Sequence, residues 1–282
     1  MGYDNIVQLR ELSRCLRLGI YFFTSPKTIM LKKNELFPKP YWDLKKLFIP
    51  PLLAILLIWS WLSSSIRPLW DKLDSNAFHF FNSWIVQDPI WQNFWAFAGH
   101  RTMDWFHDII MFFFFYYHIK FAKTLKRRRI AEFIFSLLLI TLVIWIIHAF
   151  APFFHLHRKS PTIIESTAFR LSHVIDWIHV KDFSKKSFPS DHAITALLFT
   201  SLVFNFMDSK KRWLASIYAI FFCLPRLVAG AHWLTDIVIG SFSIVLLVMS
   251  LALGTPFATW VVNTIEKGMQ KILFQLKRRI AE

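Results

Sequence analysis

The chain has 282 residues, of which 55% are hydrophobic and 18% aromatic. Soluble domains are about 45–50% apolar, so this chain has more apolar side-chain surface than one water-soluble core can bury. The 33 Lys and Arg residues against 18 Asp and Glu give a net charge of +15. No zinc-finger, RNP or basic-zipper pattern accompanies that charge, which disfavours nucleic acid as a partner. The composition predicts a membrane protein whose basic blocks meet an anionic bilayer surface.

Several enzyme classes are excluded by what the sequence lacks. Two cysteines, Cys15 and Cys223, provide neither a disulfide framework nor a thiolate metal site. The G-x-G-x-x-G, Walker A and H-E-x-x-H motifs are absent, which argues against nucleotide enzymes and zincins. The first long apolar run starts near Leu47, too late and too long for a cleaved signal peptide. We therefore expect no cofactor and no metal.

The N-terminal segment, residues 1–46, is basic and precedes the membrane domain. Within it, residues 5–20 place apolar side chains at helical spacing with arginines between them. This pattern predicts an amphipathic helix on the cytoplasmic membrane surface.

The membrane domain, residues 47–255, contains apolar runs that suit a bilayer. A spanning helix needs about 20 apolar residues, and fewer where it sits against protein. The sequence predicts an all-α bundle of six transmembrane helices. The expected spans are Leu47–Ile66, Trp105–Phe121, Ala131–Ala151, Ala193–Met207, Trp213–Val228 and Leu234–Leu253.

The basic residues fix the orientation of these spans. Blocks at 120–129 and 210–212, the N-terminal segment and the tail at 256–282 all fall on one side if there are six spans. The positive-inside rule makes that side cytoplasmic, with both termini there, and the tail also reads as an amphipathic surface helix. The opposite side receives loops 67–104, 152–192 and 229–233. Loop 152–192 carries cations against the rule, so we expect chemistry on this outer face.

Three polar clusters interrupt the apolar runs near the outer face. Because consecutive spans alternate in direction, His192, Arg226 and His232 can converge there. His232 and Asp236 are four residues apart, so the carboxylate can accept a ring N–H and leave the other nitrogen as nucleophile or base. Pro189-Ser190 breaks the chain before the fourth span, whose first-turn N–H groups attract an anion.

Together these groups suit metal-free phosphoryl transfer, because Arg226 adds a forked cation for phosphate oxygens. The structural alternative is a buried polar network that braces three helices. Ionisable groups inside a membrane are functional by default, which favours the catalytic interpretation.

The motifs P-S-x-H, ending at His192, and R-x5-H-x3-D, from Arg226 to Asp236, resemble those of the type 2 phosphatidic acid phosphatase superfamily. The resemblance implies that His232 attacks phosphorus, Asp236 orients it and His192 protonates the leaving group. It also implies that Arg226 and Ser190 hold the phosphoryl oxygens.

The first motif of that family, K-x6-R-P, is not intact. Phe153 and Ser160 occupy the positions of its Lys and Arg, and the nearest cations, Arg158 and Lys159, are candidate substitutes for binding phosphate. Asp191 stands where the common motif has Gly.

With these departures, the motifs are similar to those of the bacterial lipid A 1-diphosphate synthase branch of the family. That resemblance implies transfer of the terminal phosphoryl of undecaprenyl pyrophosphate, through phospho-His232, to the 1-phosphate of lipid A. It also implies a periplasm-facing site in the inner membrane and membrane lipids as partners.

Three further residues are candidates for substrate specificity. Asp191 can cap its helix and complement the helix dipole, or it can act on a second phosphate. Arg101 and Asp104 can contact a distal phosphate or a lipid headgroup. The polar run His100, Asp104, His107 and Asp108 is read as a span entrance and not as a metal site.

Two alternatives to the transferase stay open. With water as acceptor, the same residues make a phosphatase for undecaprenyl pyrophosphate, phosphatidic acid or phosphatidylglycerophosphate. A lipid transporter or binding protein that breaks no bond is the alternative from another class. Transporters usually bind near the midplane between repeats, whereas here the polar groups gather at one end and no repeat is found.

Overall fold

A computed structural model describes residues 42–86, 88–121, 126–150 and 158–281 of the chain. Within these ranges every regular element is helical and no strand occurs, as the sequence predicts. The predicted N-terminal amphipathic helix, residues 5–20, lies outside the described residues. The helices are α2 (Leu44–Leu62), α3 (Arg67–Asn82), η2 (Ser83–Ile85), α4 (Pro89–Ala98), α5 (Arg101–Lys120), α6 (Lys126–Phe150), α7 (Pro161–Ile164), η3 (Leu171–His173), α8 (Asp191–Phe206), α9 (Ser209–Val228), η4 (Asp236–Ser241), α10 (Phe242–Gly254) and α11 (Phe257–Ala281).

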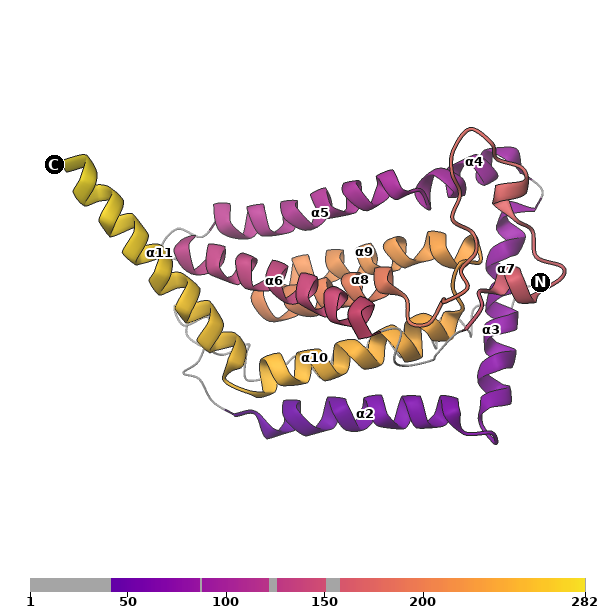
Figure 1. Ribbon diagram of the computed structural model, residues 1–282, viewed down its shortest axis with the longest axis horizontal. Coiled ribbons are helices and arrows are strands. Elements are labelled where there is room, and N and C mark those ends of the chain that lie inside the picture. Colours follow the sequence, from indigo (N-terminus) through magenta and orange to yellow (C-terminus); the bar gives the residue numbers. More distant parts are fainter. Residues whose placement is uncertain (1–41, 87, 122–125, 151–157, 282) are drawn as a thin grey trace.

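Long helices run side by side and form the body of the molecule (Figure 1). The helix α8 lies inside this bundle, packed against α6, α9 and α10. Its side chains are apolar around the whole circumference, and Leu198, Phe199 and Leu202 are fully buried. A helix without a polar face is stable only when other helices surround it, which explains the central position of α8.

Helices occupy all the predicted apolar runs, but the number of spans is not settled by their composition. In the described ranges three helices are long and apolar enough to cross a membrane: Leu44–Leu62, Lys126–Phe150 and Asp236–Gly254. The apolar helix α8 has only 16 residues. The helices α5 and α9 contain charged residues at both ends. Crossing by these three helices stays a prediction.

One end of the bundle is covered by short helices that the sequence analysis assigned to outer loops. Figure 1 shows α3 lying across the ends of the long helices, with α4 and α7 close by. The helix α3 buries Asp74, Phe78 and Phe81 on the face toward the bundle. Asn82, at the end of α3, donates to the carbonyl of Val228 at 3.3 Å, which ties α3 to the end of α9.

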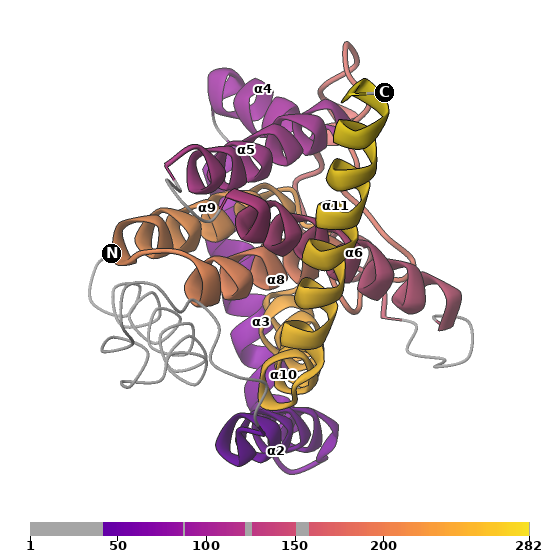
Figure 2. The same cartoon turned by 90° about the vertical axis from the view of Figure 1, so that its left-hand side faces the viewer.

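The helix α11 leaves the opposite end of the bundle and runs diagonally across it (Figures 1 and 2). Near this end Glu132 of α6 is fully buried and is paired with Arg129 at 2.9 Å and His118 at 3.1 Å. Arg128 contacts Asn263 and Glu266 of α11 and so ties this helix to α6. The apolar side chains near the C-terminal end of α11 remain exposed, as expected for a helix on a membrane surface.

Candidate active site

The three polar clusters meet at the end of the bundle that α3 covers. The start of α8, the end of α9 and the start of η4 all lie there, and α3 and α5 add one carboxylate each, from Asp74 and Asp104. Helices that alternate in direction bring these distant parts of the sequence together. His192 and Arg226 are 2.7 Å apart, and the His232 N–H lies 3.4 Å from the Arg226 carbonyl.

The turn between α9 and His232 requires glycine. Gly230 has a φ of +70°, and a Cβ atom there would lie 2.6 Å from Thr162 Cγ2 and 2.8 Å from Phe78 Cε2. Only glycine adopts this backbone conformation freely and leaves room for such close packing. The next residues fold back onto the end of α9, where the Ala231 N–H donates to the Arg226 carbonyl at 3.0 Å.

The His232 ring is oriented through its Nδ1 atom. Nδ1 lies 2.7 Å from the Ser187 carbonyl and 3.5 Å from Asp236 Oδ2. Because a carbonyl only accepts hydrogen bonds, Nδ1 carries the hydrogen and Nε2 keeps its lone pair. The predicted partner Asp236 is therefore present, but the closer partner is a backbone group. No hydrogen bond to Nε2 occurs among the described residues.

Asp236 is itself held in place by several donors. It is fully buried and accepts from the Trp233 N–H at 2.9 Å and from Arg158 Nη1 at 2.9 Å. Arg158 also donates to Thr235 Oγ1 at 2.7 Å and, through Nη2, to Asp74 Oδ2 at 2.6 Å. Arg158 thus lies between two buried carboxylates. Its guanidinium positions Asp236 in this structure, whereas the sequence analysis assigned it to phosphate.

Asp74 completes this network from α3. It is 1% exposed, and it accepts from the Thr235 N–H at 2.8 Å as well as from Arg158. Burial raises the pKa of the Asp74 carboxyl above its usual value, and the Arg158 guanidinium and Thr235 oppose that rise. The sequence analysis gave Asp74 no role, because it lies far from the three motifs in the chain.

His192 sits between two carboxylates and an arginine. Its Nδ1 is 2.7 Å from Asp191 Oδ1, and its Nε2 is 2.7 Å from Arg226 Nη2 and 3.3 Å from Asp104 Oδ1. Arginine only donates hydrogen bonds, so Nε2 accepts from Arg226 and Nδ1 carries the hydrogen. Nε2 therefore faces Arg226, the arginine that the sequence analysis predicts to bind phosphate.

Arg226 is buried and joins α9 to the start of α5. Its Nη1 donates to the Gly99 carbonyl at 2.6 Å and its Nη2 to Asp104 Oδ1 at 3.2 Å. Asp104, predicted as a specificity residue, therefore belongs to the His192 and Arg226 group. A guanidinium fixed in this way presents its remaining donor capacity in one direction.

The other predicted site residues differ in how closely they join this centre. Ser190 is buried at the N-cap of α8, where its Oγ accepts from the Ala193 N–H at 3.4 Å. The side chain of Lys159 is exposed, and its carbonyl accepts from Trp233 Nε1 at 2.8 Å. Arg101 is exposed at the start of α5, and no contact among the described residues joins it to the centre.

Metal binding is not suggested by the arrangement of donors. In the ranges that the structure describes, no group of three or more His, Cys, Asp and Glu side chains is placed to hold a metal ion. The carboxylates here face arginines and ring nitrogens instead. Activity without a metal stays a prediction.

The sequence is similar to known proteins in two comparisons. Lipid A 1-diphosphate synthase of Escherichia coli strain K12 is 25% identical to the chain over 228 residues, which cover 80% of this chain and 94% of that protein. No solved structure shows a significant match. A family model described as PAP2 superfamily matches residues 133–260, which include both histidines, Arg226 and Asp236. Over this part of the chain the protein is similar to the PAP2 superfamily, whose members are phosphatases and phosphotransferases.

Proposed function

We propose that the protein is a membrane phosphotransferase that uses His232 as its nucleophile. The observation that carries this proposal is the fixed tautomer of His232, whose Nδ1 is bound by the Ser187 carbonyl at 2.7 Å. An imidazole held in this way directs one lone pair, on Nε2, toward a substrate. Asp236, 3.5 Å from Nδ1, stabilises the positive charge that the ring acquires when Nε2 bonds to phosphorus.

In the first step Nε2 of His232 attacks the terminal phosphorus of a lipid pyrophosphate. The N–P bond forms and the bridging P–O bond breaks, which releases the lipid monophosphate. Arg226 and the first-turn N–H groups of α8 bind the phosphoryl oxygens. For this step His192 is protonated on both ring nitrogens, with Nδ1–H directed at Asp191 and Nε2–H at Asp104, 3.3 Å away, in place of Arg226. It transfers the Nε2 proton to the leaving oxygen and returns to the neutral form.

In the second step an oxygen of the acceptor attacks the phosphohistidine. The N–P bond breaks, which regenerates His232, and His192 takes up any proton that the acceptor loses. The acceptor we propose is the 1-phosphate of lipid A, because the similar Escherichia coli protein bears the name lipid A 1-diphosphate synthase. The donor we propose is undecaprenyl pyrophosphate, which the resemblance of the motifs implies.

The site is proposed to face the periplasm from the inner membrane. The basic blocks of the chain support this, since Lys126, Arg127 and the Lys210–Arg212 run belong to helix ends opposite the site. Cytoplasmic ends of membrane helices carry such an excess of Lys and Arg.

The test uses purified protein with undecaprenyl pyrophosphate labelled on its terminal phosphate. We expect the label to appear on lipid A and, transiently, on the protein as an acid-labile, base-stable phosphohistidine. His232→Ala should abolish both products, by about 10³-fold or more in rate. EDTA should leave the rate unchanged.

Each other result has a defined meaning in this experiment. Label in free phosphate alone would identify the phosphatase with water as acceptor. Label on lipid A with no loss in the His232→Ala protein would refute the proposed nucleophile. Strong inhibition by EDTA that excess Mg²⁺ reverses would refute the metal-free reaction.

A further inference from the structure

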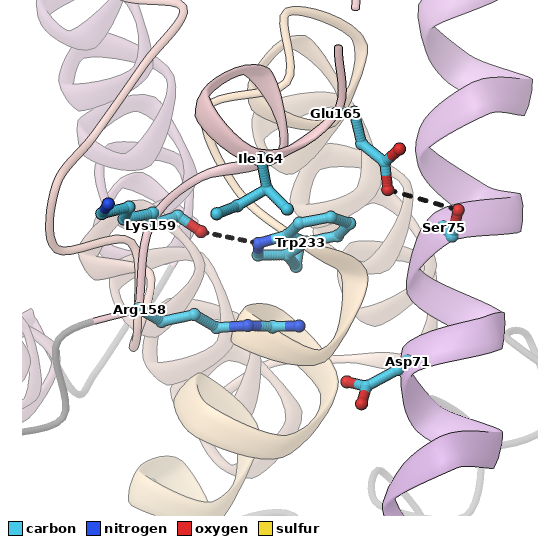
Figure 3. Close-up of a pocket in the computed structure, with 7 residues that line it drawn as sticks. All are labelled: Asp71, Ser75, Arg158, Lys159, Ile164, Glu165 and Trp233. Carbon is cyan, nitrogen blue, oxygen red and sulfur yellow. Dashed lines mark hydrogen bonds between the residues drawn. The ribbon is translucent and has the colours of Figure 1, made fainter. Parts of the chain in front are cut away.

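A cavity of about 530 Å³ is lined in part by Arg158 and by Trp233, the residue that follows His232 in the chain. Figure 3 shows Asp71 and Ser75 of α3 on one side of this cavity, and Arg158 and Lys159 of the segment before α7 on the other side. Trp233 lies between these walls. None of the proposed reaction steps uses this space. We refer to it as the Lys159 pocket; Ile164 and Glu165 complete its lining.

The inner wall of the Lys159 pocket belongs to the network that orients His232. Arg158 lines the pocket and also donates to Asp236 at 2.9 Å. Trp233, which follows His232 directly in the chain, donates from Nε1 to the Lys159 carbonyl at 2.8 Å. A molecule bound in the pocket therefore contacts residues that touch or adjoin the reacting centre.

The carboxylates of the pocket each have a neighbour that offsets part of their charge. Asp71 is paired with Arg67 at 2.7 Å. Glu165 accepts from Ser75 Oγ at 3.4 Å and lies 3.6 Å from His79 Nε2. A carboxylate has more acceptor positions than these contacts use, so the hydroxyl groups of a ligand can also donate to it. A cationic ligand gains less here, because Arg67 already neutralises Asp71.

The cations of the pocket differ in how far they are neutralised. Arg158 is occupied by Asp74 and Asp236. The Lys159 ammonium has no carboxylate partner in the ranges that the structure describes, and its side chain is exposed. A phosphate group is a suitable ligand for such an ammonium. The lining thus offers hydrogen-bond acceptors for hydroxyls. Figure 3 shows the Lys159 ammonium directed away from Trp233, and this exposed side chain turns toward the pocket when it binds an anionic group.

The size of the pocket selects among ligands with this chemistry. Small-molecule sites are typically about 300–1,000 Å³, a range that includes this pocket, whereas one phosphate or one glycerol would leave most of it empty. We propose that the Lys159 pocket binds the phosphorylated disaccharide headgroup of the acceptor lipid. This inference rests on the proposed function, since it names the site that would place the acceptor beside phospho-His232.

Direct binding tests the pocket without relying on turnover. The probe is deacylated lipid A, a water-soluble phosphorylated disaccharide, added to the full-length protein in detergent micelles and followed by isothermal titration calorimetry. We expect saturable binding that Asp71→Asn and Glu165→Gln each weaken about tenfold, because each removes a charged acceptor. The Lys159→Ala protein should bind the probe no more tightly than the wild type binds the same disaccharide without its phosphates.

The control variant is Asp176→Asn, which changes an exposed carboxylate on the same outer segment but outside the pocket. It should bind the probe as the wild type does. Melting temperatures of all variants establish that they are folded. Absence of saturable binding in the wild type would overturn the inference. So would unchanged affinity in both carboxylate variants, or glycerol phosphate binding as tightly as the disaccharide.

These outcomes are separable from those of the proposed function. A protein that binds the probe with the expected variant pattern but transfers no label to lipid A refutes the reaction and leaves the pocket intact. A protein that transfers label to lipid A while its pocket variants bind the probe normally refutes the pocket alone.

Discussion

Asp191 has a clearer role in the structure than its sequence context indicated. Its Oδ1 lies 2.7 Å from Nδ1 of His192, an arrangement that selects the tautomer whose Nε2 accepts from Arg226. We expect Asp191→Gly, which introduces the residue common in the family, to lower kcat by about 10- to 100-fold, because His192 loses its orienting carboxylate. The measurement is kcat against KM for the labelled donor, and the KM should change little.

Asp191→Asn provides the comparison for that variant. Its amide keeps the helix N-cap region polar and nearly the same size, but it removes the negative charge beside the ring. If the carboxylate matters only as part of the helix terminus, Asp191→Asn will retain full kcat, and the proposed role of Asp191 in catalysis is then wrong.

Removing Arg158 should destabilise the protein more than removing the charge of one of its two carboxylate partners. Asp74→Asn leaves Arg158 paired with Asp236, whereas Arg158→Ala leaves Asp74 and Asp236 buried without a cation. Loss of one partner from a buried ion pair costs about 3–5 kcal/mol. We expect Arg158→Ala to lower the melting temperature more than Asp74→Asn does, measured in the same detergent. The reverse order would show that Arg158 is not held mainly by these carboxylates.

Only those parts of the site that consist of side chains in recognisable motifs could be predicted from the sequence. His192, Arg226, His232 and Asp236 fall in two motifs, and the alternation of helices places them at one end. The groups that orient them were not predictable in this way. Ser187 and Gly99 act through backbone carbonyls, which any residue has. Asp74 acts from a helix more than 80 residues before Arg158 in the chain.

At the level of elements, η4 shows how a small residue positions the nucleophile. This segment is a π-helix, and a Cβ atom on its Gly240 would lie 2.8 Å from Phe188 Cε2 and 2.9 Å from Pro189 Cβ. We expect Gly240→Ala to displace the segment that carries the Ser187 carbonyl and so to lower kcat about tenfold. Gly268→Ala in α11 is the matched control, since nothing lies within 4 Å of its added Cβ.

If helix propensity alone decided stability, both substitutions would be stabilising, and only the close contacts around Gly240 make them differ. Alanine in place of glycine stabilises a helix interior by roughly 0.5–1 kcal/mol. Gly268→Ala should therefore raise the melting temperature slightly and leave kcat unchanged. A Gly240→Ala protein with wild-type kcat would show that the approach of Phe188 and Pro189 to η4 is not needed to orient His232.

The long helices were predictable because their apolar runs have the length of a bilayer span, and a helix is the structure that satisfies every backbone group there. The helices α3 and α4 were not predictable, since their content of polar residues is typical of a loop outside the membrane. The face of α3 that carries Asp74, Phe78 and Phe81 becomes interpretable only once the ends of α9 and η4 are there to cover it. The π-helical winding of η4 likewise depends on its packing.

For the whole molecule, the proposed orientation follows from charge, and it can be tested at single positions. The segment before α8 carries Lys186 on the site's side, and Lys210 lies in the first turn of α9 at the other end of the bundle. In a protein without Cys15 and Cys223, we expect Lys186→Cys to react with a membrane-impermeant maleimide in intact cells whose outer membrane has been permeabilised. Lys210→Cys should react only after the inner membrane is disrupted, because basic helix ends stay in the cytoplasm. Labelling of position 210 in intact cells would place the catalytic residues on the cytoplasmic side, where a periplasmic acceptor headgroup could not reach them.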